Sequence, residues 1–301
     1  MKKFVIVTDS CSDLDKIERD RYNIDYIKLH YSYDGKQSDA DLDWGNVSFK
    51  DFYDIMRGGT RIITAQVNVE EYKLAFEKYL KEGLDILYLG CSSALSGSVK
   101  ASYVARDELL KAYPDRKIIC IDTLNPCLGQ GILCMVASEL RAEGKTIEEV
   151  AAWVEEHRKF VHQEATVDKL TWLKQAGRVS AASAFFGGLL NVKPIIINDA
   201  IGANVAIEKV KGRKVSMNKL VERFSTDFVD YPFQKIYIVH GDCEEDANEL
   251  KSLVENALPE GSKHLEVNVR KLGPIIGASC GPGTLGIYYF GTEVTHDSSK
   301  A

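Results

Sequence analysis

Short apolar runs alternate with helical patterns through the first half of the chain, and this rhythm constrains the fold more than any other feature. Phe4–Val7, Ile86–Leu89 and Lys117–Ile121 are apolar runs of strand length, Gly97–Tyr113 has the pattern of a helix, and a further helix follows Pro126. Apolar strands separated by helices are typical of a parallel sheet covered on both faces. The sequence therefore predicts an N-terminal α/β/α domain with a parallel sheet.

The second half has shorter connections between its predicted strands. We expect strands at Pro194–Ile197, Val205–Val210, Lys235–His240, Leu265–Val269 and Leu285–Phe290, with a helix around Asp246–Ala257. Short turns join antiparallel strands, whereas parallel strands need long crossovers. This half is therefore predicted to be a two-layer α/β domain with a mixed sheet and helices on one face. We place the boundary near residue 163, which gives closely packed domains of residues 1–163 and 164–301, because no linker rich in Pro, Gly or Ser separates them.

Local motifs predict several element boundaries. Asn68–Glu71 and Thr146–Glu149 match the capping box, in which a polar N-cap and a Glu three residues later bond to each other's backbone. Ser12–Asp15 resembles the same motif and predicts a short charged helix after it. Tyr26–Tyr33 alternates between apolar and polar residues and predicts a single strand.

Charge and cysteine usage limit the class of protein. The net charge is −6 and the pI is near 5.6, which argues against nucleic-acid binding, because that affinity comes mostly from Lys and Arg contacts. No apolar stretch approaches the roughly 18 residues of a membrane span, and Phe4–Val7 is too short for a signal peptide. The seven cysteines are odd in number and form no Cys-x-x-Cys pair. We therefore expect reduced thiols in a cytoplasmic protein without stable membrane insertion.

Two polar segments ahead of helices are candidates for ligand contacts. Thr64, in the segment Ile-Thr-Ala-Gln, is interpreted either as a local helix cap or as a ligand contact. Ser96 and Gly97 follow a predicted strand and open a helix, where hydroxyls and free backbone N–H groups form an anion site. Simple capping is the alternative there too. The second segment matches neither a Walker loop nor a Gly-x-Ser-x-Gly elbow.

Two further segments lie in the second half. Gly177 is predicted to end a helix in the left-handed conformation, after which Arg178 either projects into a cleft between the domains or is a solvated surface residue. Gly277, Ser279 and Cys280 belong to a glycine-rich segment. Its glycines either bring a ligand close to the backbone or form a tight turn before the last strand.

Motifs for metals and cofactors are weak. The histidines are scattered, most of them in segments expected to be exposed, and no His/Asp/Glu cluster has the spacing of a metal site. The pair Gly129-x-Gly131 lacks the third glycine of a dinucleotide motif. We predict neither a metal nor a cofactor.

Taken together, these segments resemble the DegV family over almost the whole chain. The opening IVTDSCSDL is similar to the family's Thr-Asp-Ser start, ITAQ to its Thr-Thr-Ser-Gln, and SSALSGS to its Ser-Ser-x-Leu-Ser-Gly-Thr. IDTLNPCLGQG resembles Asp-Ser-x-x-x-Ser-x-Gly, while LKQAGRVS with LLNVKPII resembles Leu-x-x-Gly-Gly-Arg-Ile-Ser with Leu-Asn-Ile-Lys-Pro. IIGASCGPGTLG is similar to Ile-Gly-x-His-x-Gly-Pro-Gly-x-x-Gly. No single motif is decisive, but the ordered set is specific.

The resemblance implies two α/β domains that hold one long-chain fatty acid between them, in a protein that is not itself an enzyme. Some members present the acid to a separate fatty-acid kinase, which makes this kinase an implied partner. The carried-over carboxylate ligands are Thr64 and Ser96, and Arg178 matches the family's cleft arginine. Ser279 stands where the family commonly has His, and Cys280 takes the place of the small residue after it. A serine cannot titrate near neutral pH as a histidine does.

Two interpretations from other classes remain beside lipid binding. One is an enzyme that acts on a small phosphorylated or acylated substrate through Ser96 or a cysteine, although no histidine falls in any of the four segments. The other is a regulatory partner protein without ligand chemistry. Under the lipid interpretation, the small-residue stretch Ala181–Leu190 lines the acyl tunnel; an ordinary buried helix would have the same composition.

Overall fold

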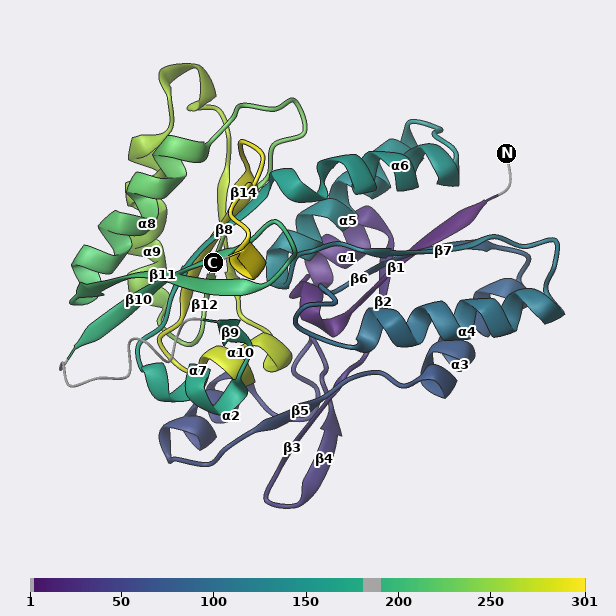
Figure 1. Ribbon diagram of the computed structural model, residues 1–301, viewed down its shortest axis with the longest axis horizontal. Helices are drawn as coiled ribbons and strands as arrows, with labels where there is room; N and C mark the ends of the chain where they lie inside the picture. The colour runs from purple at the N-terminus through teal and green to yellow at the C-terminus, as the bar shows by residue number, and fades with distance from the viewer. Residues whose placement is uncertain (1–2, 181–190, 301) are drawn as a thin grey trace.

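The computed structural model describes residues 3–180 and 191–300, so the predicted tunnel lining at 181–190 lies outside the described residues. The first half forms a four-stranded, fully parallel sheet in the order β2-β1-β6-β7 (Figure 1). Its strands are β1 (Phe4–Asp9), β2 (Ile24–Ile27), β6 (Asp85–Gly90) and β7 (Ile118–Asp122). The predicted parallel sheet is confirmed.

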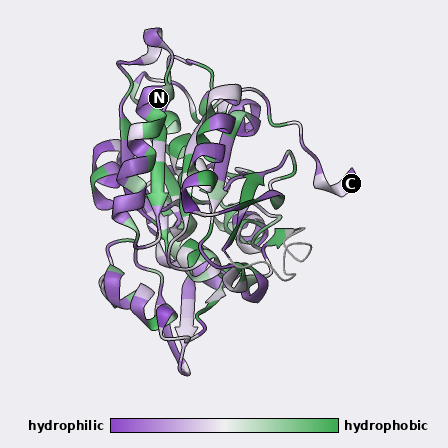
Figure 2. Ribbon diagram, turned by 90° about the vertical axis from the view of Figure 1, so that its left-hand side faces the viewer, coloured by the Kyte–Doolittle hydropathy of each residue, from purple (hydrophilic) through white to green (hydrophobic). Residues whose placement is uncertain are grey.

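Helices cover both faces of this sheet because successive strand residues point to opposite sides. Val7 and Tyr88 pack toward one face, against α3 and α4, whereas Ile6 and Leu87 pack toward the other, against α5 and α6. Figure 2 shows the apolar residues gathered on the central strands and the polar residues on the outer helices. The helices are α1 (Lys16–Tyr22), α3 (Val69–Lys81), α4 (Ser98–Ala112), α5 (Cys127–Ala142) and α6 (Ile147–His157), with short turns η1 (Ser10–Ser12) and η2 (Arg158–Phe160).

Two of the three predicted helix caps are confirmed. Complete capping boxes begin α3 at Asn68 and α6 at Thr146. The third prediction is wrong by three residues: Asp15 is the N-cap of α1 and accepts the N–H of Glu18 at 3.0 Å, while Ser12 ends η1. Both positions offer a capping oxygen followed by an acidic residue, so the motif alone cannot choose between them.

A small antiparallel sheet was not predicted. The segment expected as one strand over 26–33 is divided into β2 and β3 (His30–Tyr33), because Leu29 donates its N–H to Ser10 Oγ at 2.9 Å rather than to a strand. β3 pairs with β4 (Lys36–Asp39) and β5 (Ile63–Ala65) in the order β4-β3-β5, and α2 (Phe49–Arg57) lies between β4 and β5 in the chain.

The second half contains a seven-stranded mixed sheet in the order β13-β12-β14-β8-β10-β11-β9. Four of its pairings are antiparallel and two are parallel, as predicted for a mixed sheet. The strands are β8 (Val161–Thr166), β9 (Val179–Ser180), β10 (Val192–Asn198), β11 (Asn204–Lys211), β12 (Ile236–His240), β13 (Val267–Lys271) and β14 (Leu285–Phe290). The predicted boundary at 163 falls inside β8, whose residues all belong to this sheet; the division into 1–163 and 164–301 stays a prediction.

The two long helices of this half, α8 (Arg213–Asp227) and α9 (Glu244–Ala257), cover one face of the mixed sheet. The opposite face meets the first half: Tyr237 and Tyr288 share a core with α5. Two short helices, α7 (Leu170–Ala176) and α10 (Pro274–Cys280), also pack toward the first half, where Trp172 and Ile275 join its other core. The turns η4 (Glu260–Ser262) and η5 (Ser298–Lys300) complete the described elements. The two halves therefore pack closely. None of the described helices has the length and apolar character needed to cross a membrane.

Candidate functional site

A cavity of about 390 Å³ lies between the two halves. Its floor is at the carboxyl end of the parallel sheet, where Cys11 follows β1 and Cys91 follows β6; these strands are neighbours, so their following loops meet. Helices α7 and α10 and strand β5 close its other sides. Ligands in open α/β sheets usually bind beyond the carboxyl ends of the strands, as predicted for this loop region.

Thr64 lines the cavity from β5, where it is paired with Tyr31 of β3. Its interpretation as a helix cap is wrong, because α3 begins five positions later at Val69 and Asn68 supplies the cap. The Thr64 side chain is half-buried. Thr64 is therefore a cavity-lining strand residue and not a helix cap.

Ser96 and Gly97 line the cavity at the start of α4. Gly97 is the N-cap and has no side chain to satisfy the first N–H groups of the helix, while Ser96 Oγ accepts the N–H of Ser98 at 3.2 Å. The end of the flexible Gln66 side chain lies against Gly97. The positive end of the helix dipole and a hydroxyl therefore both lie at the cavity wall.

Arg178 follows Gly177, which ends α7 in the left-handed conformation (φ 67°) as predicted. The arginine is exposed, donates to the carbonyl of Ala176 at 2.5 Å and lines the cavity mouth. Arg178 is thus both exposed and a lining residue, so each of the two interpretations holds in part. Among the described lining residues it is the single Lys or Arg, and none of them is Asp or Glu.

Helix α10 contributes Ser279 and Cys280 to the cavity, together with Ile275 and Ile276. Ser279 Oγ donates to the carbonyl of Ile275 at 3.4 Å. The glycine-rich segment is thus helical up to Cys280, and the turn before β14 is confined to the glycines after it, which have positive φ.

Gly277 was also predicted to contact the ligand, and the structure does not place it among the described residues that line the cavity. It faces the opposite side of α10, where a β-carbon would collide with the hydroxyl of Tyr53. That hydroxyl donates to the carbonyl of Leu272 at 2.9 Å. Glycine at 277 is therefore required by helix packing rather than by a ligand.

The three cysteines in the cavity wall are neutral thiols. A hydrogen bond with Cys91, together with burial, raises the pKa of Cys11 well above its usual value. Burial raises the pKa of Cys280 to about 12. A thiolate is the reactive form of cysteine, so these side chains contribute polarizable apolar surface.

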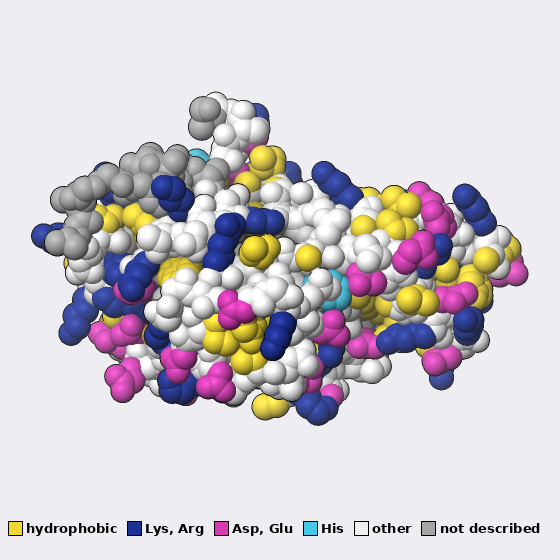
Figure 3. Space-filling model, turned by 90° about the horizontal axis from the view of Figure 1, so that it is seen from below, with side chains coloured by type: hydrophobic (Ala, Val, Ile, Leu, Met, Phe, Trp, Pro, Cys, Tyr) yellow, Lys and Arg dark blue, Asp and Glu magenta, His cyan; other side chains and the backbone are white. Residues whose placement is uncertain are grey.

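Sequence reasoning missed much of the lining. Cys11 and Cys91 could have been found, because each lies in the loop that follows a predicted strand of the parallel sheet. Several apolar lining residues lie inside the family-like segments but were not singled out, because an apolar side chain does not by itself indicate a ligand; among them are Leu95, Pro126, Leu173, Ala176 and Val179. Leu29 and Asn204 lie outside those segments. Figure 3 shows acidic and basic side chains interspersed over one face of the molecule, rather than one extended basic surface.

The fold joins a parallel α/β/α sheet to a mixed two-layer sheet. Between them lies a mostly apolar cavity with one cation at its mouth. These features define a class of two-part α/β ligand-binding proteins. A model of the DegV family of uncharacterised proteins matches residues 3–292. The chain belongs to the DegV family.

Relatives share both sequence and fold with this chain. A DegV domain-containing protein of Clostridium perfringens is 39% identical over 97% of this chain and 98% of its own length. A DegV lipid-binding protein from Thermotoga maritima has a TM-score of 0.84 at 26% identity, covering 97% of this chain and all of its own. A DegV family protein from Thermus thermophilus, described for its fatty-acid binding, has a TM-score of 0.83 at 27% identity over the same shares.

Proposed function

We propose that this protein binds one long-chain fatty acid in the cavity, with the carboxylate held by Thr64, Ser96 and the start of α4, and with Arg178 at the mouth. The observation that carries the proposal is the charge of the lining: one arginine, no acidic side chain among the described residues, and otherwise apolar or hydroxyl-bearing groups. The lipid and fatty-acid binding of the Thermotoga and Thermus proteins supports it.

The energetics fit such a ligand. An acyl chain of ~14 methylenes gains roughly 11 kcal/mol on burial at about 0.8 kcal/mol per methylene, before the cost of ordering. A carboxylate removed from water needs hydrogen bonds or a counter-charge. In the proposal, the two hydroxyls and the N–H groups at the start of α4 supply the hydrogen bonds, and the guanidinium of Arg178 supplies the counter-charge.

Catalysis at this site is disfavoured by the groups that surround Ser96. A nucleophilic serine needs an adjacent base, and no described lining residue is His, Asp or Glu. The thiols are held neutral by burial and hydrogen bonding. We therefore propose a carrier rather than an enzyme.

The carrier is proposed to act in the cytoplasm and to present its acid to a fatty-acid kinase. All seven cysteines are free, which supports a reducing compartment. The kinase partner rests on the family resemblance. Incubating the loaded protein with a fatty-acid kinase and ATP tests this partnership, and acyl phosphate is the expected product. The control is the same kinase with another carrier on which it is active. Acyl phosphate formed with that carrier but not with this protein would contradict the partnership.

Native mass spectrometry of the purified protein tests lipid binding directly. We expect a copurifying mass of one fatty acid per chain, with rebinding of palmitate or oleate after delipidation. Arg178→Gln should weaken binding of palmitate and leave binding of methyl palmitate unchanged, because only the acid carries a charge; Lys174→Gln, on α7, is the matched control. A protein that contains no lipid and binds neither acid would contradict the proposal.

A further inference from the structure

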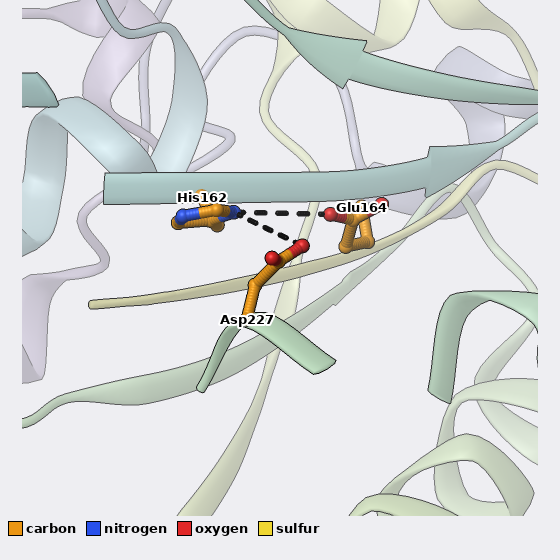
Figure 4. Close-up of side chains that lie close together, drawn as sticks. All are labelled: His162, Glu164 and Asp227. Atoms are coloured by element: carbon orange, nitrogen blue, oxygen red, sulfur yellow. Dashed lines mark ion pairs between the residues drawn. The ribbon is translucent and has the colours of Figure 1, made fainter. Parts of the chain in front are cut away.

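A second group of chemically capable side chains lies far from the cavity mouth, between β8 and α8 (Figure 4). His162 and Glu164 are two residues apart on β8 and therefore share one face of the sheet, the face that α8 covers. Asp227, the last residue of α8, completes the cluster. His162 Nδ1 lies 4.0 Å from Glu164 Oε1 and 3.9 Å from Asp227 Oδ2. The sequence spacing does not indicate this cluster, because Asp227 is distant from His162 and Glu164 in the chain.

The ring of His162 is oriented like that of a metal ligand. Its Nε2 lies 2.7 Å from the carbonyl oxygen of Thr292, which can only accept a hydrogen bond, so Nε2 carries the proton. In the neutral ring, Nδ1 then presents its lone pair to the two carboxylates. Metal-bound histidines usually donate their other N–H to a carbonyl or carboxylate in this way. The backbone N–H of Thr292 also donates to the carbonyl of Asp227 at 2.8 Å, which ties both ligands to one loop.

Glu164 supplies an independent indication of a missing ligand. Its side chain is 1% exposed, and Oε2 accepts from Arg223 Nε at 2.5 Å, but Oε1, the oxygen aimed at the cluster, has no hydrogen-bond partner. The buried hydroxyl of Tyr289, whose ring stacks on His162, has no partner either. A buried carboxylate oxygen without a partner is costly. A cation bound beside Glu164 Oε1 would satisfy this oxygen.

We propose that His162, Glu164 and Asp227 bind a divalent transition-metal cation. The three ligand atoms lie within 4.8 Å of one another. Atoms bound to one tetrahedral ion at about 2.1 Å lie about 3.4 Å apart. The two histidine–carboxylate distances, 4.0 and 3.9 Å, would therefore each have to shorten by roughly half an ångström when the ion binds. One imidazole with two carboxylates suits Zn²⁺ better than Mg²⁺, which prefers oxygen ligands alone.

The charges of the cluster also favour a cation. Two carboxylates and Arg223 sum to one negative charge when His162 is neutral. Arg223 contacts the oxygen of Glu164 that points away from the cluster, and it lies 3.9 Å from Asp227 Oδ2. The Asp227 side chain is 25% exposed and opens a route from solvent. The site is separate from the lipid cavity: Gln163, between the two ligands on β8, points to the opposite face and accepts from Tyr288.

Calorimetric titration of the full-length, chelator-treated protein with Zn²⁺ tests the proposal. One equivalent is expected to bind, with Mg²⁺ at least tenfold weaker, and Asp227→Asn should abolish binding. Asp43→Asn is the control, since Asp43 also pairs with an arginine, at 2.7 Å from Arg19, outside the cluster. Binding that survives in Asp227→Asn, or no binding at all, overturns the proposal and leaves only an ion-pair cluster.

A crystallographic measurement on the unaltered protein covers the case in which the variant does not fold. Crystals soaked in Zn²⁺ should give an anomalous peak bonded to His162 Nδ1, Glu164 Oε1 and Asp227 Oδ2. A peak at a cysteine such as Cys243 instead, or none, contradicts the site. Fatty-acid content should be unchanged by chelation or by Asp227→Asn, which separates failure of this site from failure of the proposed lipid binding.

Discussion

The floor of the cavity and the cluster beneath α8 are both buried, yet burial has opposite effects on their charges. Around the cavity floor, three groups are shifted toward their neutral forms. A hydrogen bond with Cys91 and burial raise the pKa of Cys11, burial raises the pKa of Cys280 to about 12, and burial raises the pKa of nearby Asp13 to about 8. Beneath α8, Glu164 is equally buried but contacts Arg223. Desolvation disfavours an isolated charge, whereas a close counter-ion retains it. A lipid tail needs the first environment and a cation needs the second.

The largest expected effect tests the neutral region. Because the folded-state pKa of Asp13 is raised from 3.8 to about 8, the folded protein holds a proton that the unfolded chain releases above about pH 4. Its contribution to stability is therefore present below pH 4 and is lost as pH rises toward 8. The free energy of unfolding of the unaltered protein should fall by on the order of 4 kcal/mol between pH 4 and 7 through this group, and Asp13→Asn should abolish that fall. Urea unfolding across this range measures it; parallel profiles for the two proteins would show that Asp13 is charged.

The charged region should respond to loss of its ion pair. Glu164→Gln keeps the shape of the side chain but leaves Arg223 without its main partner, so we expect a loss of about 3 kcal/mol in the free energy of unfolding, measured with chelator present. Asp20→Asn is the control, because Asp20 pairs with Lys16 at 2.7 Å and both side chains are exposed. Such surface pairs contribute less than about 1 kcal/mol. Equal effects from both would remove the distinction between the two regions.

Removing hydroxyls from the cavity should affect binding without affecting folding. Thr64→Ala and Ser96→Ala are each expected to weaken fatty-acid binding by about 1–3 kcal/mol, the range for a hydrogen bond to a charged group. Ser93→Ala, in the same loop as Ser96 but not lining the cavity, should leave affinity unchanged. Unchanged affinity in both cavity variants would mean that these hydroxyls serve only local structure.

The smallest effect concerns Ser279. The described cavity lining has no side chain that titrates between about pH 5 and 7, so binding should vary little there beyond titration of the acid itself. In Ser279→His, the protonated imidazole would pair with the carboxylate, and affinity should rise by about 1 kcal/mol as pH falls below about 6.5. Binding titrations from pH 5 to 8 measure this. Identical profiles would show that position 279 does not face the carboxylate.

The sequence predicted what depends on local pattern. The apolar runs that became β6 and β14, and the capping boxes at Asn68 and Thr146, were confirmed because each is decided by a few neighbouring residues. What depends on distant pairing was missed. Thr64 belongs to a strand only because β3 pairs with it, and the cluster beneath α8 needs Asp227 brought to β8. The predicted residues that line the cavity were identified from their places in the family motifs. Gly277 stands in the same motif as Ser279, but it packs against Tyr53 and does not line the cavity.

The interlocking of the two halves has a consequence for how a ligand enters and leaves. Trp172 and Ile275 belong to a core built mainly by the first half, and the hydroxyl of Tyr53 is bonded to the carbonyl of Leu272 across the junction. A hinge that parted the halves would expose these contacts to water all at once. Loading and unloading should therefore proceed through small movements of α7 and Arg178 at the mouth. For the proposed ligand, exchange would then be slow, and its rate would respond to changes at that rim.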